Sequence, residues 1–156
     1  MLADHDVVEQ SAWRGRILLV ENSAIRQRFV GGMLATLGFC VDVVVDGAEA
    51  VKAVARTEYR AILMDCQSPC LNGYAATTEI RRRQGESPHT PIVGLTASAT
   101  GSDLKKCSAS GMDDSLTNAF NLETLNAVLS RWTSTDQHLI PRPVIPTPDR
   151  RRTANV

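Results

Sequence analysis

The chain has 156 residues, 43% of them hydrophobic, and its 17 basic residues balance 17 acidic ones, so the formal net charge is zero. This length suits one domain with loose ends, and the composition allows a real core. A neutral chain gives no support for binding to nucleic acid or to a membrane surface, and no apolar run approaches the length of a membrane span. The first 15 residues lack a signal-peptide layout, so we expect a cytoplasmic protein without membrane contact in this segment.

Short apolar runs mark the predicted strands. They are Arg16–Val20, Cys40–Val45, Ala61–Asp65, Pro91–Leu95 and a weaker run at Asp114–Thr117. Three of the runs are almost continuously apolar, as expected for parallel strands that are covered on both faces. Asp42 interrupts the second run, which predicts a more exposed strand near the sheet edge.

Helical patterns fill the intervals between these runs. Ser23 can cap a first helix whose predicted apolar face is Ile25, Phe29, Met33 and Leu37. Further helices are predicted after the caps Asp46 and Asn121, and at Tyr74–Arg83 and Ser102–Ser110. The inner side of the last helix is predicted to hold Leu122, Leu125, Val128, Leu129 and Trp132.

The order of elements is therefore strand, helix, five times over. Such alternation predicts an α/β fold with a parallel sheet and helices on both faces, and five strands suit the flavodoxin-like doubly wound order 2-1-3-4-5. We assign this domain to residues 15–133. Residues 1–14 are predicted to be a flexible N-terminal segment, and the proline-rich, then basic, residues 134–156 a disordered tail or linker.

The cysteines do not form a recognisable metal motif. Cys66 and Cys70 are close in sequence, but the chain has no CxxC pair, and Cys40 and Cys107 lie in apolar patterns. We therefore expect free thiols in a reducing compartment, with Cys40 and Cys107 as small core residues.

Polar side chains follow the predicted strands. Glu21 and Asn22 follow the first strand, Asp65 ends the third, Thr96 follows the fourth and Asn118 follows the fifth. Because the carboxyl ends of parallel strands meet at one edge of the sheet, these side chains should converge where this fold usually places its site.

Several motifs in order resemble one family. They are RILLVENSAIRQ, LGFCVDVVVDGAEAV, YRAILMDCQSPCLNGYAATTEIRR, TPIVGLTASAT, KCSASGMDD and LNAVLSRW, and they span about Arg16 to Trp132. In these motifs the chain resembles the receiver domain of bacterial two-component signalling, and most of all the receivers of hybrid histidine kinases.

The resemblance implies phosphoryl transfer from a phosphohistidine to an aspartate. By its match, Asp65 holds the place of the acceptor, and Glu21 and Asn22 hold the places of an acidic pair that binds magnesium together with it. Thr96 holds the place of the switch hydroxyl, and Asn118 that of a lysine that contacts the phosphoryl group.

The chain departs from the family pattern at four of the matched positions. Asn22 is neutral where the family has a carboxylate, and Asn118 is neutral where it has the lysine. A hydrogen bond to a charged group is worth about 1.5–3 kcal/mol, so the missing lysine alone should cost one to two decades of phosphoryl stabilisation. Ala119 replaces a proline, which predicts a trans peptide and a reshaped loop, and Ser115 replaces an aromatic residue.

These departures predict a degenerate receiver that has a weak magnesium site or none, and that acts largely by phosphorylation-independent protein interaction. Two alternatives stay open: a working phosphoacceptor at Asp65, and a pseudo-receiver that senses a small ligand. The expected partners are a histidine kinase, a histidine phosphotransfer domain, or other domains of a parent hybrid kinase. No independent turnover is expected.

Overall fold

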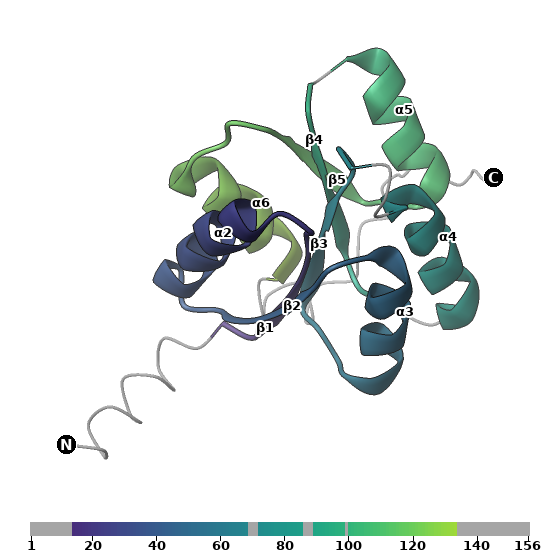
Figure 1. Ribbon diagram of the computed structural model, residues 1–156, viewed down its shortest axis with the longest axis horizontal. Helices are drawn as coiled ribbons and strands as arrows, with labels where there is room; N and C mark the ends of the chain where they lie inside the picture. Colours follow the sequence, from purple (N-terminus) through teal and green to yellow (C-terminus); the bar gives the residue numbers. More distant parts are fainter. Residues whose placement is uncertain (1–13, 69–71, 86–88, 99, 134–156) are drawn as a thin grey trace.

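The computed structural model describes residues 14–68, 72–85, 89–98 and 100–133 (Figure 1). Five parallel strands form one sheet in the order β2-β1-β3-β4-β5. The strands are β1 (Arg16–Val20), β2 (Cys40–Val44), β3 (Ala61–Asp65), β4 (Ile92–Thr96) and β5 (Asp114–Thr117). The helices are α2 (Ala24–Thr36), α3 (Gly47–Arg56), α4 (Gly73–Gln84), α5 (Gly101–Ser110) and α6 (Leu122–Thr133). The predicted flavodoxin-like fold and strand order are confirmed.

The sheet is covered on both faces. Helices α2 and α6 lie on one side, and α3, α4 and α5 lie on the other (Figure 1). One core cluster joins Leu34 of α2 and Leu125 of α6 to the sheet, and the other joins Ala50 of α3 and Ile80 of α4 to the opposite face. Strands β3 and β4 are buried along their whole length. None of the helices in the described ranges is long and apolar enough to span a bilayer.

The predicted helix caps are present. The side chains of Ser23, Asp46 and Asn121 accept hydrogen bonds from the backbone N–H groups three residues further on. Gly111 ends α5 in the left-handed conformation, with φ of 108°, which a glycine adopts without strain. These local signals begin α2, α3 and α6, and end α5, where the sequence predicts.

The predicted apolar face of α2 is wrong in its first half. Ile25 is 80% exposed and Phe29 is 59% exposed, whereas Val30 and Leu34 are buried. Residues four apart advance by about 40° around a helix, so a row read in steps of four drifts off the buried face. In α6, Leu122 is likewise exposed, while Leu125 and Leu129 fill the core as predicted.

Two further expectations concern the sheet edge and the cysteines. β2 is the half-exposed edge strand, and its Asp42 pairs with Arg16 at 2.9 Å. Cys40 is exposed at the start of this strand, so its assignment to the core is wrong, whereas Cys107 is buried. Cys40, Cys66 and Cys107 are free thiols, and Cys70 lies outside the described residues.

Arg14, the last residue of the predicted N-terminal segment, contacts the last helix of the domain. Arg14 Nη1 donates a hydrogen bond to Asn126 Oδ1 at 2.8 Å, so Arg14 is attached to α6. The remainder of the predicted N-terminal segment, residues 1–13, and the predicted tail, residues 134–156, lie outside the described residues.

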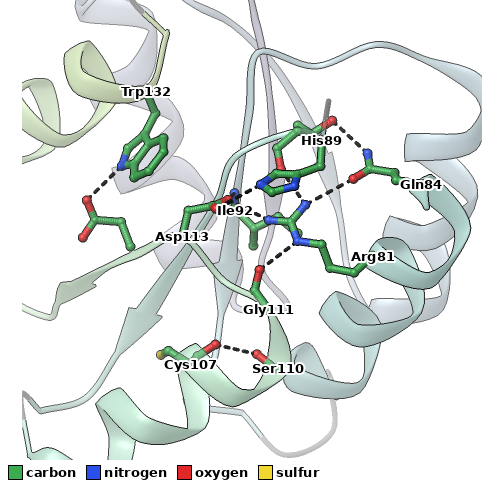
Figure 2. Close-up of polar contacts among 11 residues, drawn as sticks. Arg81, Gln84, His89, Ile92, Cys107, Ser110, Gly111, Asp113 and Trp132 are labelled. Carbon is green, nitrogen blue, oxygen red and sulfur yellow. Dashed lines mark hydrogen bonds and ion pairs between the residues drawn. The ribbon is translucent and has the colours of Figure 1, made fainter. Parts of the chain in front are cut away.

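Asp113 is the anchor between α4 and the start of β5. Its Oδ2 accepts hydrogen bonds from Arg81 Nη2 at 2.6 Å and from the Ile92 backbone N–H at 2.9 Å, and its Oδ1 lies 3.1 Å from His89 Nε2 (Figure 2). Burial opposes ionisation of this carboxyl, but the contact with His89 and the charge of Arg81 outweigh burial and lower the pKa of Asp113.

Asp113→Asn is expected to lower the free energy of unfolding by about 1.5–3 kcal/mol at neutral pH, because Arg81 loses its charged partner. A group whose folded pKa is depressed stabilises the fold above its unfolded pKa, so this deficit should shrink as the pH falls below about 4. Urea unfolding at several pH values measures it. Glu58→Gln, at an exposed position, is the control, and an equal loss in both variants would contradict the assignment.

Candidate functional site

The carboxyl ends of the central strands bring the predicted residues to one edge of the sheet. The register pairs Val20 with Met64, Asp65 with Leu95 and Thr96 with Thr117, so the residues after β1, β3, β4 and β5 lie at a common level. We call Glu21, Asn22, Asp65, Thr96 and Asn118 the strand-end site.

Burial divides these five side chains into two groups. Glu21, Asp65 and Thr96 are almost fully buried, at 1%, 0% and 1% exposure, whereas Asn22 and Asn118 are exposed. The three residues that the resemblance matches to the family are therefore the buried ones, and the two asparagines that it predicts as departures lie at the surface.

Asp65 is a buried carboxylate whose hydrogen bonding is incomplete. Its Oδ1 accepts a hydrogen bond from the Gln67 backbone N–H at 2.8 Å, while Oδ2 is buried without a hydrogen-bond partner. Burial raises the pKa of Asp65 to about 6, and the hydrogen bond from Gln67 only partly offsets this. The nearby carboxylate of Glu21 raises the pKa of Asp65 further. At neutral pH the ionised carboxylate of Asp65 is therefore an unfavourable buried charge at the end of β3.

Arg26 brings a positive charge to this edge, and the sequence reasoning missed it. Its Nε lies 3.2 Å from Glu21 Oε2, and its Nη2 lies 3.6 Å from Asp65 Oδ2. The hydrogen bond to Glu21 raises the pKa of Arg26, so the guanidinium stays charged. One side chain from α2 therefore faces both buried carboxylates.

The start of α2 places Arg26 there. Ser23 caps the helix by accepting a hydrogen bond from the Arg26 backbone N–H at 3.3 Å, and the Ser23 N–H donates to Glu21 Oε2 at 3.1 Å. Gln27 Nε2 also donates to the Glu21 carbonyl at 2.6 Å. The signal in the sequence was an arginine in the first turn of a helix, where the helix dipole disfavours a cation.

The two asparagines form hydrogen bonds with residues outside the pair of buried carboxylates. Asn22 Nδ2 donates to Ser68 Oγ at 3.1 Å, so its amide is engaged with the segment that follows β3. The Asn118 backbone N–H donates to the Thr96 carbonyl at 2.8 Å, which continues the β4–β5 pairing. Thr96 Oγ1 donates to the Leu116 carbonyl at 3.5 Å within the sheet.

The loop after β5 has an unusual alanine. The described peptide bonds are all trans, as expected for Ala119, and Ala119 has φ of 46°, in the left-handed region. An L-residue with a Cβ atom costs about 1–2 kcal/mol in this region. The loop that follows Asn118 is therefore strained by its alanine.

The strand-end site offers two charged oxygen ligands, the carboxylates of Glu21 and Asp65, where the resemblance implies three. Magnesium prefers charged oxygen ligands in an octahedral arrangement. Here the negatively charged carboxylates of Glu21 and Asp65 lie close together, and the guanidinium of Arg26 is ion-paired with both. The described ranges contain no group of three or more acidic, histidine or cysteine side chains that could hold a metal ion.

A model of the response regulator receiver domain matches residues 17–130 of the chain. The chain belongs to the response regulator receiver domain family. Among proteins similar to this receiver domain, hybrid signal transduction histidine kinase G of Dictyostelium discoideum is 37% identical over 119 residues. The match covers 75% of this chain and 4% of that protein. Transcription factor SKN7 of Chaetomium thermophilum is 35% identical, with 78% of this chain and 16% of that protein covered.

Solved receiver domains share the fold. The receiver domain of a Pseudomonas aeruginosa sensor histidine kinase, crystallised with magnesium in its active site cleft, is 41% identical with a TM-score of 0.68. The match covers 76% of this chain and 97% of the Pseudomonas aeruginosa receiver chain. The yeast Ssk1 receiver domain, solved in complex with the histidine phosphotransfer protein Ypd1, is 29% identical with a TM-score of 0.71. The match covers 81% of this chain and 92% of the Ssk1 receiver chain. The similarity thus extends to both bacterial and eukaryotic receivers.

Asp65→Asn is expected to stabilise this receiver domain. Its carboxyl is fully buried and has a pKa of about 6, so at neutral pH the fold holds an unfavourable charge. A shift of this size corresponds to at most roughly 3 kcal/mol, and we expect a gain of about 1–2 kcal/mol at pH 7. Because the folded pKa is raised, the gain should shrink as the pH falls from 6 to 4. Thermal unfolding across this range measures the gain, and a destabilised variant at pH 7 would contradict it.

Ala119→Gly is expected to raise the free energy of unfolding by about 0.5–1 kcal/mol, since glycine adopts a positive φ without the Cβ clash. Ala127→Gly, at an exposed position inside α6, is a matched control of opposite sign and should destabilise by about 1 kcal/mol. Chemical unfolding of both variants measures this pair of effects. Destabilisation by both changes would show that Ala119 is not strained.

Proposed function

We propose that this receiver domain is degenerate, and that it takes part in phosphorelay signalling largely through phosphorylation-independent protein interaction. The observation that carries the proposal is the charge arrangement at the strand-end site. The lysine position holds the neutral, exposed Asn118, and the cation that faces Asp65 is Arg26, which is already paired with Glu21.

Phosphoryl transfer to a carboxylate explains why this arrangement matters. Asp65 would attack phosphorus as an anion, and the incoming phosphoryl group is itself negative, so added positive charge must offset the repulsion. Magnesium supplies that charge when it is bound, and the family lysine supplies more. With Asn22 and Asn118 neutral, this site lacks a charged ligand for the metal and a charged contact for the phosphoryl group.

The proposed partners follow from the family and from one solved complex of a similar receiver. The Ssk1 receiver is bound to a histidine phosphotransfer protein in its structure, and several relatives are hybrid histidine kinases. We propose that this domain associates with a histidine kinase, with a histidine phosphotransfer domain, or with other domains of a parent hybrid kinase, in the cytoplasm. The fold and the buried strand-end residues are intact, so a receiver-shaped surface is available without the chemistry.

A working phosphoacceptor remains the second candidate, and one observation favours it. Asp65 Oδ2 faces Arg26 at 3.6 Å but is buried without a hydrogen-bond partner, so this carboxylate oxygen could serve as the nucleophile. Thr96 also lies at the matching end of β4, within the same site.

Intact mass after incubation with acetyl phosphate and magnesium separates the two candidates. For the degenerate receiver, the unmodified chain should remain largely unlabelled, while Asn22→Asp combined with Asn118→Lys should gain a phosphoryl group at about 10- to 100-fold higher yield. Asp65→Asn added to the double variant should abolish that label. Equal labelling of the unmodified chain and the double variant would overturn the proposal in favour of a working acceptor.

A further inference from the structure

We propose that Arg26 is a built-in counter-cation that takes the place of a divalent metal between Glu21 and Asp65, so that the resting domain is independent of magnesium. The inference deepens the proposed function and rests on it, since it names what neutralises the strand-end site when no metal or phosphoryl group does. It concerns metal binding, however, and can fail separately.

The first step is that both carboxylates need a cation. Glu21 and Asp65 are buried at 1% and 0% exposure at the carboxyl ends of the neighbouring strands β1 and β3, where two like charges repel each other with little screening. Within the ranges that the structure describes, Arg26 is the basic side chain ion-paired with either of them. Both contacts come from one guanidinium.

The second step is that the position of Arg26 conflicts with its local preference. It lies in the first turn of α2, a turn without acidic residues, where the helix dipole repels a cation. A residue that breaks a local rule is expected to have a compensating interaction elsewhere. Here the compensation is the pair of buried carboxylates, which Arg26 reaches while Ser23 holds the backbone at the helix start.

The third step is competition. Glu21 and Asp65 are the charged residues that would hold a divalent ion, and Arg26 already lies 3.2 Å from one carboxylate oxygen of Glu21 and 3.6 Å from one of Asp65. Two cations at that spacing repel, and Asn22 adds no charge that would favour the metal. Magnesium could therefore bind well only after Arg26 has left.

The consequence is a testable exchange between side chain and metal. If Arg26 is removed, Glu21 and Asp65 lose their counter-charge, and the domain should become less stable and acquire a response to magnesium. The unmodified domain should show no such response. Arg28 supplies a matched control, because it is an exposed arginine on the same helix and removing it changes the net charge equally.

The experiment measures the melting temperature of the unmodified chain, Arg26→Gln and Arg28→Gln, each with and without millimolar magnesium. Arg26→Gln should melt lower without the metal, and magnesium should raise its Tm by at least about 4 °C. The unmodified chain and Arg28→Gln should shift by less than about 1 °C. A magnesium shift in the unmodified chain equal to that in Arg26→Gln would overturn the inference.

A second variant keeps the test decisive if Arg26→Gln does not fold. Arg26→Gln combined with Glu21→Gln removes one carboxylate along with the cation, so the double variant should fold without magnesium and should not respond to it. A double variant that also fails to fold would overturn the inference. If the unmodified chain accepts a phosphoryl group but its Tm does not respond to magnesium, the result counts against the proposed function alone. If its Tm rises with magnesium but it accepts no phosphoryl group, the result counts against the inference on Arg26 alone.

Discussion

Two carboxylates at the buried edge of a parallel sheet need a positive charge beside them, and the rest of this site depends on where that charge comes from. The fold fixes Glu21 and Asp65 on adjacent strands, with exposures of 1% and 0%, so neither can turn to solvent for relief. Arg26 meets the need from within the chain. The arrangement links the capping of α2 to the electrostatics of the sheet, since the helix start determines whether the guanidinium can reach.

This constraint gives the departures from the family pattern a physical meaning. Asn22 and Asn118 each remove a charge, one negative and one positive, so together they leave the net charge of the site unchanged. Arg26 then leaves a charge of minus one over itself and the two buried carboxylates. Neither asparagine belongs to the two core clusters, because both side chains are exposed.

The sequence could predict the fold and the strand-end site because each relied on a simple periodic rule. Continuous apolar runs mark buried parallel strands, and the polar residue after each run must then lie at the shared edge. The role of Arg26 could not be read in the same way, because a guanidinium reaches its partners through a long side chain whose direction depends on the helix start. The exposed Ile25 and Phe29 show the same limit, since a small error in helical phase moves a side chain from core to solvent. The positive φ of Ala119 was also not predictable, because alanine seldom adopts this conformation. Asn72 has a positive φ as well, and asparagine adopts it more readily.

The split between buried and exposed positions in this site has an evolutionary consequence. Changes at Asn22 and Asn118 meet solvent and do not disturb the packing of the core, so selection for folding alone would neither prevent nor favour them. Chemical competence can therefore drift away, or return, through a few substitutions on an unchanged scaffold. Asp65 differs, because its buried charge burdens the fold that carries it. Folding alone does not account for this buried carboxylate, so its presence indicates a use other than folding.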